Sequence, residues 1–255
     1  MWHCRCERTL ARSDLRAALW GLLRRDPERA SGAGAPFHPH PPVQKIQDLR
    51  YTSAMPHRIG IFGGTFDPPH LGHMILASEA LQQLKLTRLL WMLTPVPPHK
   101  QNQHITAVNH RLEMVQCAIR DVPRFELSTV EFERPAPQYT VDTLRILKEQ
   151  NPSADLILVL GADSLRSIAT WNRPTDLVAL CDEIGVMQRP GELIQMGVLE
   201  AAIPNLKGKV RFVETPLLQI SSREIRRRIA EGLEYRYFLT PPVYDYIQAN
   251  HIYGA

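Results

Sequence analysis

From residue 57 onward, short apolar runs alternate with segments of helical periodicity. Three apolar runs have the pattern of buried strands: 57–64, 88–96 and 155–163. Three segments carry apolar residues at helical spacing: 71–84, 110–121 and 140–151. Strands that alternate with helices of this length predict a parallel sheet. Because crossovers are right-handed, we expect an α/β fold, a doubly wound Rossmann-like parallel sheet with helices on both faces.

Shorter runs continue the pattern toward the C-terminus. We expect further strands at 125–128, 130–132, 183–191 and 209–215, with a helix between the last two. Two more helices are expected at 221–232 and 241–250. They would form a small C-terminal helical part that begins near residue 220.

A chain of 255 residues allows one large domain or one domain with appendages. Residues 1–54 are rich in arginine and run into a proline, glycine and histidine mixture at 31–42 without apolar periodicity. We therefore expect 1–54 to be a disordered extension and 55–255 to be the folded domain. One interpretation is that the natural chain starts at Met55. Charged residues interrupt any signal-like apolar stretch, and acidic residues disfavour an organelle-targeting helix.

The net charge of +4 lies entirely in this N-terminal segment. Residues 1–54 hold 9 Lys and Arg against 5 Asp and Glu, whereas 55–255 hold 21 of each kind. The balanced body therefore gives no reason to expect a nucleic-acid partner. No apolar run approaches the ~20 residues that span a membrane. The four cysteines lack Cys-x-x-Cys spacing and indicate a reducing compartment, so we expect a cytoplasmic protein.

The stretch GGTFDPPHLGH (63–73) directly follows the first predicted strand. In a doubly wound sheet, ligands bind beyond the carboxyl ends of the strands, so this stretch lies where a ligand would. Gly63 and Gly64 allow close approach to the backbone, and the following helix start offers free amides to an anion. His70 and His73 are three residues apart and share one face of that helix.

Other interpretations of this stretch remain open. The dinucleotide-binding and P-loop glycine patterns are both absent. A histidine at a helix start can be a solvated cap, and histidines at this spacing can bind zinc. No further cluster of metal ligands accompanies the pair, so we predict no metal site held by the protein itself.

The motif GGTFDPPHLGH resembles that of the nucleotidyltransferase family that shares a His-x-Gly-His element with class I aminoacyl-tRNA synthetases. Within that family, the bacterial nicotinate-nucleotide adenylyltransferases are most similar. The resemblance covers Met55 to the C-terminus. It also rests on PVPPHK (95–100), QYTVDTL (138–144), LGADSL (160–165), Trp171 and QISSREIRRRI (219–229). It implies a nucleotidyltransferase-type fold, with 55–255 as the nucleotidyltransferase domain of an enzyme of NAD biosynthesis.

The implied reaction joins ATP and nicotinate mononucleotide to give nicotinate adenine dinucleotide and pyrophosphate. Its nucleophile is already an anion, so catalysis depends on alignment and on donors placed around the phosphates. We predict His70, His73 and Arg226 as catalytic residues, and Mg²⁺ carried in with ATP. The predicted ATP-binding residues are Gly63, Gly64, Thr65, Phe66, His70, His73, Gly161, Asp163, Ile220, Ser221, Ser222 and Arg226.

The pyridine end determines which mononucleotide is accepted. The predicted mononucleotide-binding residues are Lys100, Thr140, Asp163, Trp171 and Asn172. Trp171 offers a flat face for the ring, although it could equally pack in the core. By resemblance, the backbone at Thr140 and Asn172 binds the nicotinate carboxylate, and Asp163 would accept hydrogen bonds from a ribose. Asp142 could also bind a ribose, but we expect it to cap its helix.

Several basic residues have two interpretations. Lys100 could contact phosphate or be an exposed loop lysine, and Arg111 could bind a ligand or form a surface ion pair. Arg223 replaces a threonine that the family more often carries. We expect Arg227 and Arg228 to form a solvated helix face.

Two alternative functions remain. The acceptor could be nicotinamide mononucleotide or another phosphate ester. The chain could also be a nucleotide-binding regulator without turnover. Neither the oligomeric state nor the role of residues 1–54 can be predicted.

Overall fold

In the computed structural model, residues 57–97, 104–188, 194–216 and 219–255 are described. Within them, six strands form one sheet in the order β3-β2-β1-β4-β5-β6. The strands are β1 (Arg58–Gly64), β2 (Arg88–Leu93), β3 (Phe125–Ser128), β4 (Asp155–Gly161), β5 (Glu183–Gln188) and β6 (Val210–Glu214). Every neighbouring pair is parallel. The strand order reverses between β1 and β4, so a ligand site is expected at the carboxyl ends of these strands.

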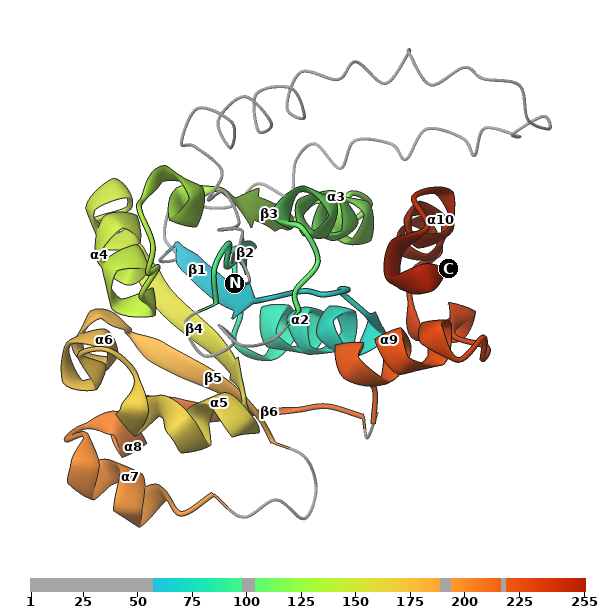
Figure 1. The fold of residues 1–255 in the computed structure, drawn as a ribbon. Coiled ribbons are helices and arrows are strands. Elements are labelled where there is room, and N and C mark those ends of the chain that lie inside the picture. The colour runs from blue at the N-terminus through green and yellow to red at the C-terminus, as the bar shows by residue number, and fades with distance from the viewer. Residues whose placement is uncertain (1–56, 98–103, 189–193, 217–218) are drawn as a thin grey trace, which may run out of the picture. The chain divides into compact units, whose positions relative to one another are not determined.

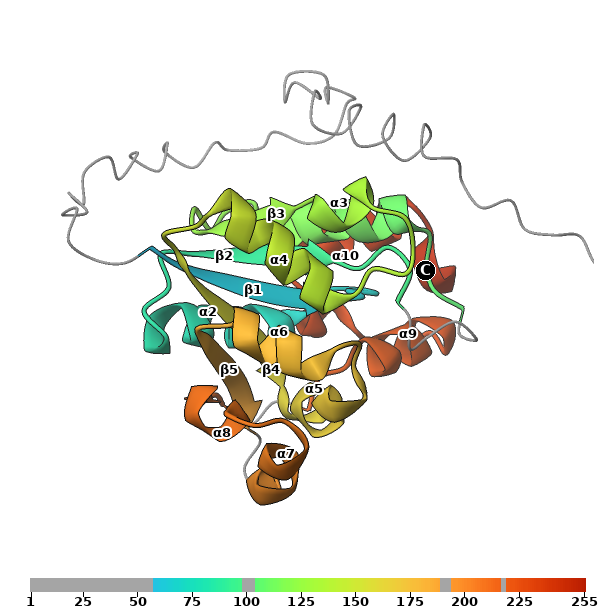
Figure 2. The ribbon, with the colours of Figure 1, turned by 90° about the vertical axis from the view of Figure 1, so that its left-hand side faces the viewer.

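Helices cover both faces of the sheet (Figures 1 and 2). The helices are α2 (Leu71–Gln83), α3 (Val108–Ile119), α4 (Thr140–Gln150), α5 (Ala162–Ser167), α6 (Pro174–Leu180), α7 (Met196–Ala202), α8 (Leu206–Lys209), α9 (Ser222–Ala230) and α10 (Pro241–Ala249). Figure 2 shows α4 and α2 on opposite sides of β1. The predicted doubly wound α/β fold is confirmed.

Alternation along the central strands explains the two faces. Ile59 and Ile61 pack with α4, α5 and α6 in one buried cluster. Gly60 points the other way, where a Cβ atom would come within 2.5 Å of Leu86, just beyond the end of α2. Side chains of a strand point to opposite faces in turn, so this hydrophobic core requires apolar residues on nearly every position of β1 and β4.

The sequence predictions differ from the structure at short elements. Residues 130–132 were expected as a strand, but Val130–Glu133 form a 3₁₀ helix. That expectation is wrong because β3 is the edge strand and ends at Ser128, and the amide of Phe132 then bonds back to the carbonyl of Thr129. The predicted strand 155–163 ends at Gly161, where α5 begins.

Some predictions lie outside the described residues. These are the disorder of residues 1–54, the role of Lys100, and the last residues of the strand expected at 183–191. Within the described part of the chain, no helix is long and apolar enough to cross a membrane.

Candidate active site

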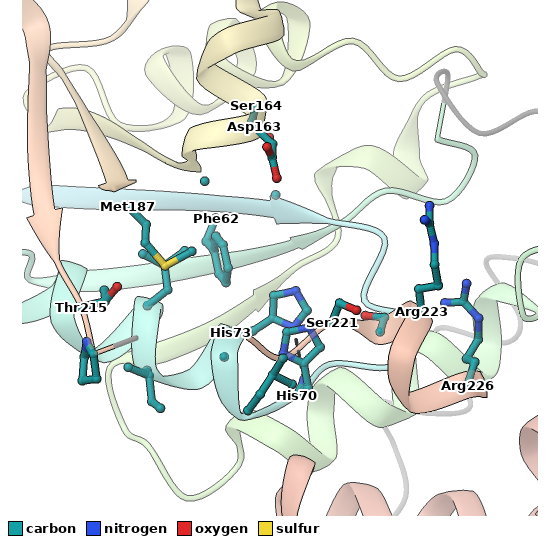
Figure 3. A pocket seen from close by; sticks show the side chains of 18 residues that line it. Phe62, His70, His73, Asp163, Ser164, Met187, Thr215, Ser221, Arg223 and Arg226 are labelled. Atoms are coloured by element: carbon teal, nitrogen blue, oxygen red, sulfur yellow. Dashed lines mark hydrogen bonds between the residues drawn. The ribbon is translucent and has the colours of Figure 1, made fainter. Parts of the chain in front are cut away.

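A cavity of about 640 Å³ opens at the carboxyl ends of β1, β4 and β5. Four parts of the chain line it: the end of β1 with the start of α2, the β4–α5 junction, Met187 of β5, and residues 215–216 together with 220–226. Figure 3 shows His70 and His73 beside Ser221, with Asp163 across the cavity and Arg223 and Arg226 at one end. The cavity therefore lies at the reversal of strand order, where the topology predicts a ligand.

The two imidazoles of this cavity are stacked on each other. Their ring centroids lie 3.7 Å apart with an interplanar angle of 23°. The backbone N–H of His70 donates to Nδ1 of His73 at 3.2 Å. Because Nδ1 of His73 accepts, the proton of a neutral His73 is on Nε2. The local backbone thus prepares His73 as an N–H donor.

His70 is buried, with 7% of its surface exposed. Burial lowers the pKa of His70 to about 4, because desolvation disfavours the imidazolium. Its Nδ1 atom has no hydrogen-bond partner among the described residues. A buried polar atom without a partner is costly and therefore uncommon in folded proteins.

Gly72 makes the imidazole stack possible. A Cβ atom at Gly72 would lie 3.1 Å from both Cε1 and Nδ1 of His70. Such a contact is tighter than ordinary van der Waals packing and would displace the ring. On the other side, His73 contacts Phe66 edge to face at 5.1 Å, and Phe66 packs on Trp91. The histidine positions are therefore fixed from both sides.

The start of α9 forms the opposite wall. Ser221 caps the helix, since its Oγ accepts from the amide of Glu224 at 3.2 Å. Ser222 Oγ donates to the carbonyl of Pro68 at 2.8 Å. Both serines are predicted ATP-binding residues, and the structure shows that the hydroxyl of Ser222 connects α9 to the 63–73 loop. Arg226 makes a similar contact, because its Nη1 donates to the carbonyl of Asp67 at 2.6 Å.

The other arginines of α9 differ in their partners. Arg227 forms ion pairs with Glu224 and Glu231 on the helix surface. Arg228 pairs with Glu224 and lies over the ring of Phe238. Both make the helix-surface contacts expected of a solvated face. The side chain of Arg223, in contrast, is exposed and lines the cavity.

A second cavity of about 320 Å³ adjoins the first, since Gly63 and Ser164 line both. Its walls include Gly64, Thr65, Thr140, Trp171 and Asn172. Thr140 begins α4, so the free amides of that helix start lie at this cavity. The predicted pyridine-binding residues of the described chain are thus brought together here, with the exception of Asp163, which lines the first cavity and pairs with Arg166.

Both interpretations of Trp171 agree with its position. It is half-buried, packs against the hydrophobic cluster and lines the second cavity. Its Nε1 donates to Ser167 Oγ at 3.4 Å, which holds the ring. One face can therefore pack on the core while another meets a ligand.

The floor of the second cavity contains a buried polar cluster that the sequence analysis missed. Glu131 is 4% exposed and accepts from Thr143 Oγ1 at 3.0 Å. Burial raises the pKa of Glu131 above its ordinary value. Oε2 of Glu131 and Oε1 of Gln138 have no hydrogen-bond partner among the described residues. Glu131 was missed because residues 130–132 were predicted as a strand. A glutamate within that apolar run was the signal that could have indicated a buried polar residue.

Two other polar residues have structural partners that the sequence did not indicate. Arg111 is 2% exposed, so it is neither a surface ion pair nor a residue that lines either large cavity. Its guanidinium donates to four carbonyls: those of Thr65, Thr94, Pro95 and Thr106. Arg111 therefore connects the loop after β1, the loop after β2 and the segment before α3 by hydrogen bonds.

Asp142 also departs from expectation. It makes no capping hydrogen bond to the start of α4. Its carboxylate instead pairs with Arg134, Arg145 and Arg173. The expectation of a helix cap is wrong because three nearby guanidinium groups compete for the same oxygens.

The remaining predicted residues lie close to the two cavities. Gly161 and Ile220 line the first, and Phe66 lies beneath the imidazoles beside a small cavity of about 100 Å³. Within the described residues, no three His, Cys, Asp or Glu side chains gather as a group that could hold a metal ion.

Sequence and fold comparisons identify relatives of this chain. Residues 61–228 match the family described as cytidylyltransferase-like. A probable nicotinate-nucleotide adenylyltransferase of Thermomicrobium roseum is 41% identical over 196 residues, which are 77% of this chain and 91% of that protein. The nicotinate-nucleotide adenylyltransferase of Bacillus subtilis is 39% identical over 198 residues, which are 78% and 99% of the two chains.

Among solved structures, the Plasmodium falciparum nicotinic acid mononucleotide adenylyltransferase complexed with NaAD has a similar fold. Its TM-score is 0.64 at 21% sequence identity, and the match covers 77% of this chain and 97% of that one. The prediction of a nucleotidyltransferase enzyme is confirmed by the family and the relatives together. This chain therefore belongs to the cytidylyltransferase-like family, and within it to the nicotinate-nucleotide adenylyltransferase group.

Proposed function

We propose that this enzyme transfers the adenylyl group of ATP to nicotinate mononucleotide, releasing pyrophosphate. One observation carries the proposal beyond the names of the relatives. The cavity with the imidazole stack and the cavity with Trp171 and the start of α4 share Gly63 and Ser164. Two nucleotides that bind these cavities would meet at the end of β1, as a transfer between them requires.

The chemistry follows from the charges of the reactants. A phosphate oxygen of the mononucleotide forms a bond to the α-phosphorus of ATP, while the bond from that phosphorus to the bridging oxygen breaks. The pyrophosphate leaves with the bonding electrons. The nucleophile is anionic already, so no residue needs to remove a proton. What the protein must supply is alignment and hydrogen-bond donors for the developing charge.

The residues of the first cavity suit this task. We assign Nε2–H of His73 and the imidazole of His70 to the phosphate oxygens nearest the reacting phosphorus. Ser221, Arg226 and the amides at the start of α9 would hold the leaving pyrophosphate, because a helix N-terminus and a guanidinium both favour anions. The exposed Arg223 adds a positive charge at the same end.

The second cavity would hold the pyridine ring. Trp171 offers a stacking surface, and the amides at the start of α4 favour a carboxylate. The buried Glu131 gives a specific reason to keep nicotinamide mononucleotide as the second candidate. A glutamate carboxylate accepts from an amide N–H₂, whereas a protonated glutamate can donate to a carboxylate. Burial raises the pKa of Glu131, which is the direction that a neighbouring nicotinate carboxylate would require.

A divalent cation, Mg²⁺, is expected to accompany ATP and to screen the charge of its phosphates. Mg²⁺ commonly keeps several waters and binds mainly to substrate phosphates rather than to a full protein cage. Asp163 is the exposed carboxylate of the first cavity that could contact such hydrated ions. A cytoplasmic location also stays a prediction.

A coupled pyrophosphate assay with ATP and Mg²⁺ tests the function. The acceptors are nicotinate mononucleotide, nicotinamide mononucleotide and simple phosphate esters. We expect turnover with the nicotinate compound to exceed the others. Equal use of both mononucleotides would favour the second candidate, and no pyrophosphate with any acceptor would contradict adenylyl transfer.

A further inference from the structure

A tyrosine near the end of the described chain is bonded to the loop that carries the histidines. Tyr253 Oη donates to Asp67 Oδ1 at 2.6 Å across 186 residues of sequence. Asp67 belongs to the 63–73 loop and is 4% exposed. Tyr253 lines neither large cavity. Its shortest contact with the site is the hydrogen bond to Asp67.

Asp67 connects three parts of the site. Its Oδ2 accepts from the amide of Thr106 at 3.2 Å. Its backbone carbonyl accepts from Arg226 Nη1 at 2.6 Å. The same Nη1 lies 3.9 Å from Oδ2, close enough for charge attraction but too far for a hydrogen bond. The carboxylate is thus bonded on both oxygens while the arginine is held by the backbone.

The backbone at both ends of the tyrosine contact is strained. Tyr253 has φ 65° and ψ 11°, and Phe66, next to Asp67, has φ 47°. Left-handed conformations are uncommon for aromatic residues and persist where the surrounding structure enforces them. The hydrogen bond between Tyr253 and Asp67 is the contact that links these two strained positions.

The hydroxyl of Tyr253 is suited to act as a permanent donor. Burial, and then the adjacent charge of Asp67, raise the pKa of Tyr253 well above its ordinary value. The proton therefore stays on the phenol across the working pH range. A protonated hydroxyl satisfies Oδ1 without adding a positive charge to the loop.

We propose that Tyr253 is a positioning residue for the ATP half of the active site: it holds the carboxylate of Asp67 away from Arg226, so that the guanidinium stays available to the triphosphate. This inference rests on the proposed function. Without the hydroxyl, Asp67 Oδ1 would lose its donor and the carboxylate would turn toward the guanidinium 3.9 Å away. A direct ion pair would then compete with phosphate for Arg226.

The test compares Tyr253→Phe with Tyr246→Phe in the full chain. Tyr246 is a matched control, because it belongs to the same C-terminal part, its hydroxyl lies 3.0 Å from His110 Nδ1, and it is not among the residues that line either large cavity. We would measure the affinity for a non-cleavable ATP analogue by calorimetry, KM for each substrate, and the melting temperature. Tyr253→Phe should weaken analogue binding about tenfold and raise KM for ATP similarly, with KM for the mononucleotide within about twofold.

Three results would overturn the inference. They are unchanged analogue binding in Tyr253→Phe, an equal rise of KM for both substrates, and the same loss of analogue binding in Tyr246→Phe. A double-mutant cycle sharpens the test. In an Arg226→Lys background, the tenfold effect of Tyr253→Phe on analogue binding should shrink to about twofold or less, because the guanidinium it protects is gone. Full additivity of the two substitutions would contradict the proposed mechanism.

The binding measurement separates this inference from the proposed function. If the wild-type chain binds the ATP analogue but releases no pyrophosphate with any acceptor, the function fails while the comparison of Tyr253→Phe with Tyr246→Phe still decides the inference. If the wild-type chain does not bind the analogue at all, both are wrong.

Discussion

The two adjoining cavities of this enzyme are built in different ways. The first takes its polar groups from two short sequence stretches, 63–73 and 220–226, and from the β4–α5 junction. The second draws on more elements: β1, β2, β4, the 3₁₀ helix Val130–Glu133, the start of α4, residues 171–172 and α6. Histidine and arginine side chains line the first, whereas the buried Glu131 and the ring of Trp171 line the second.

This difference has a physical basis. Holding a triphosphate requires amides and donors at helix starts, and consecutive residues supply these locally. Recognising a flat ring requires walls on several sides, and one segment cannot provide them. The first cavity should therefore respond strongly to single substitutions in its motifs, and the second more weakly to substitution of any one wall.

The largest expected effect is on the first cavity. His73→Ala removes the Nε2–H donor and should lower kcat by about 10²- to 10³-fold, the range for loss of one donor to developing charge. KM for the mononucleotide should change little. His57→Ala, an exposed residue at the opposite end of β1, serves as the control. Normal turnover in His73→Ala would remove the imidazole from the mechanism.

The second expected effect concerns stability and pH. The pKa of His70 is lowered from 6.5 to about 4, so between these values the unfolded chain binds a proton that the folded chain does not. Stability due to neutral His70 is thus present above pH 6.5 and lost as pH falls toward 4, by at most about 3 kcal/mol.

Urea unfolding at several pH values can measure this loss. Between pH 6.5 and 4, the free energy of unfolding should decrease less in His70→Gln than in the wild type. The exposed His251→Gln should show the same decrease as the wild type. If the free energy of unfolding changes equally with pH in the wild type and in His70→Gln, His70 is not buried as a neutral group.

A smaller effect is expected in the second cavity. Trp171→Ala should raise KM for the mononucleotide about tenfold, in line with the energy of an aromatic contact, and leave KM for ATP nearly unchanged. Tyr237→Ala, at a tyrosine that is 79% exposed, is the control. An equal change in KM for both substrates would erase the distinction between the cavities.

The smallest effect tests the spacing inside the first motif. Gly72→Ala places a Cβ atom 3.1 Å from the ring of His70 and should lower kcat about fivefold by tilting it. Gly197→Ala, in α7 with open space at the Cβ position, should leave kcat unchanged. Gly197→Ala replaces a helical glycine in open space and should raise stability by up to ~1 kcal/mol, whereas the close contact with His70 should offset this gain in Gly72→Ala. A normal kcat in Gly72→Ala would show that the imidazole stack is not required.

The contrast between the cavities also explains what could be predicted. The 63–73 stretch could be placed from sequence because it follows an apolar strand and begins a helix, and both signals are local. Thr140 and Trp171 were found through their resemblance to the family, and the structure brings them to one cavity. Glu131 was missed because a four-residue 3₁₀ helix and a short strand have nearly the same pattern.

The order of apolar runs and amphipathic segments was sufficient by itself to determine the doubly wound sheet, its direction and the edge where a ligand site is expected. The positions of the 63–73 motif and of the serines at the start of α9 could also be predicted, because a strand end and a helix start depend on neighbouring residues. The burial of Arg111 against four carbonyls and the contact of Tyr253 with Asp67 were decided by tertiary structure alone. Contacts across a hundred or more residues depend on which surfaces pack together, and no local pattern records that choice.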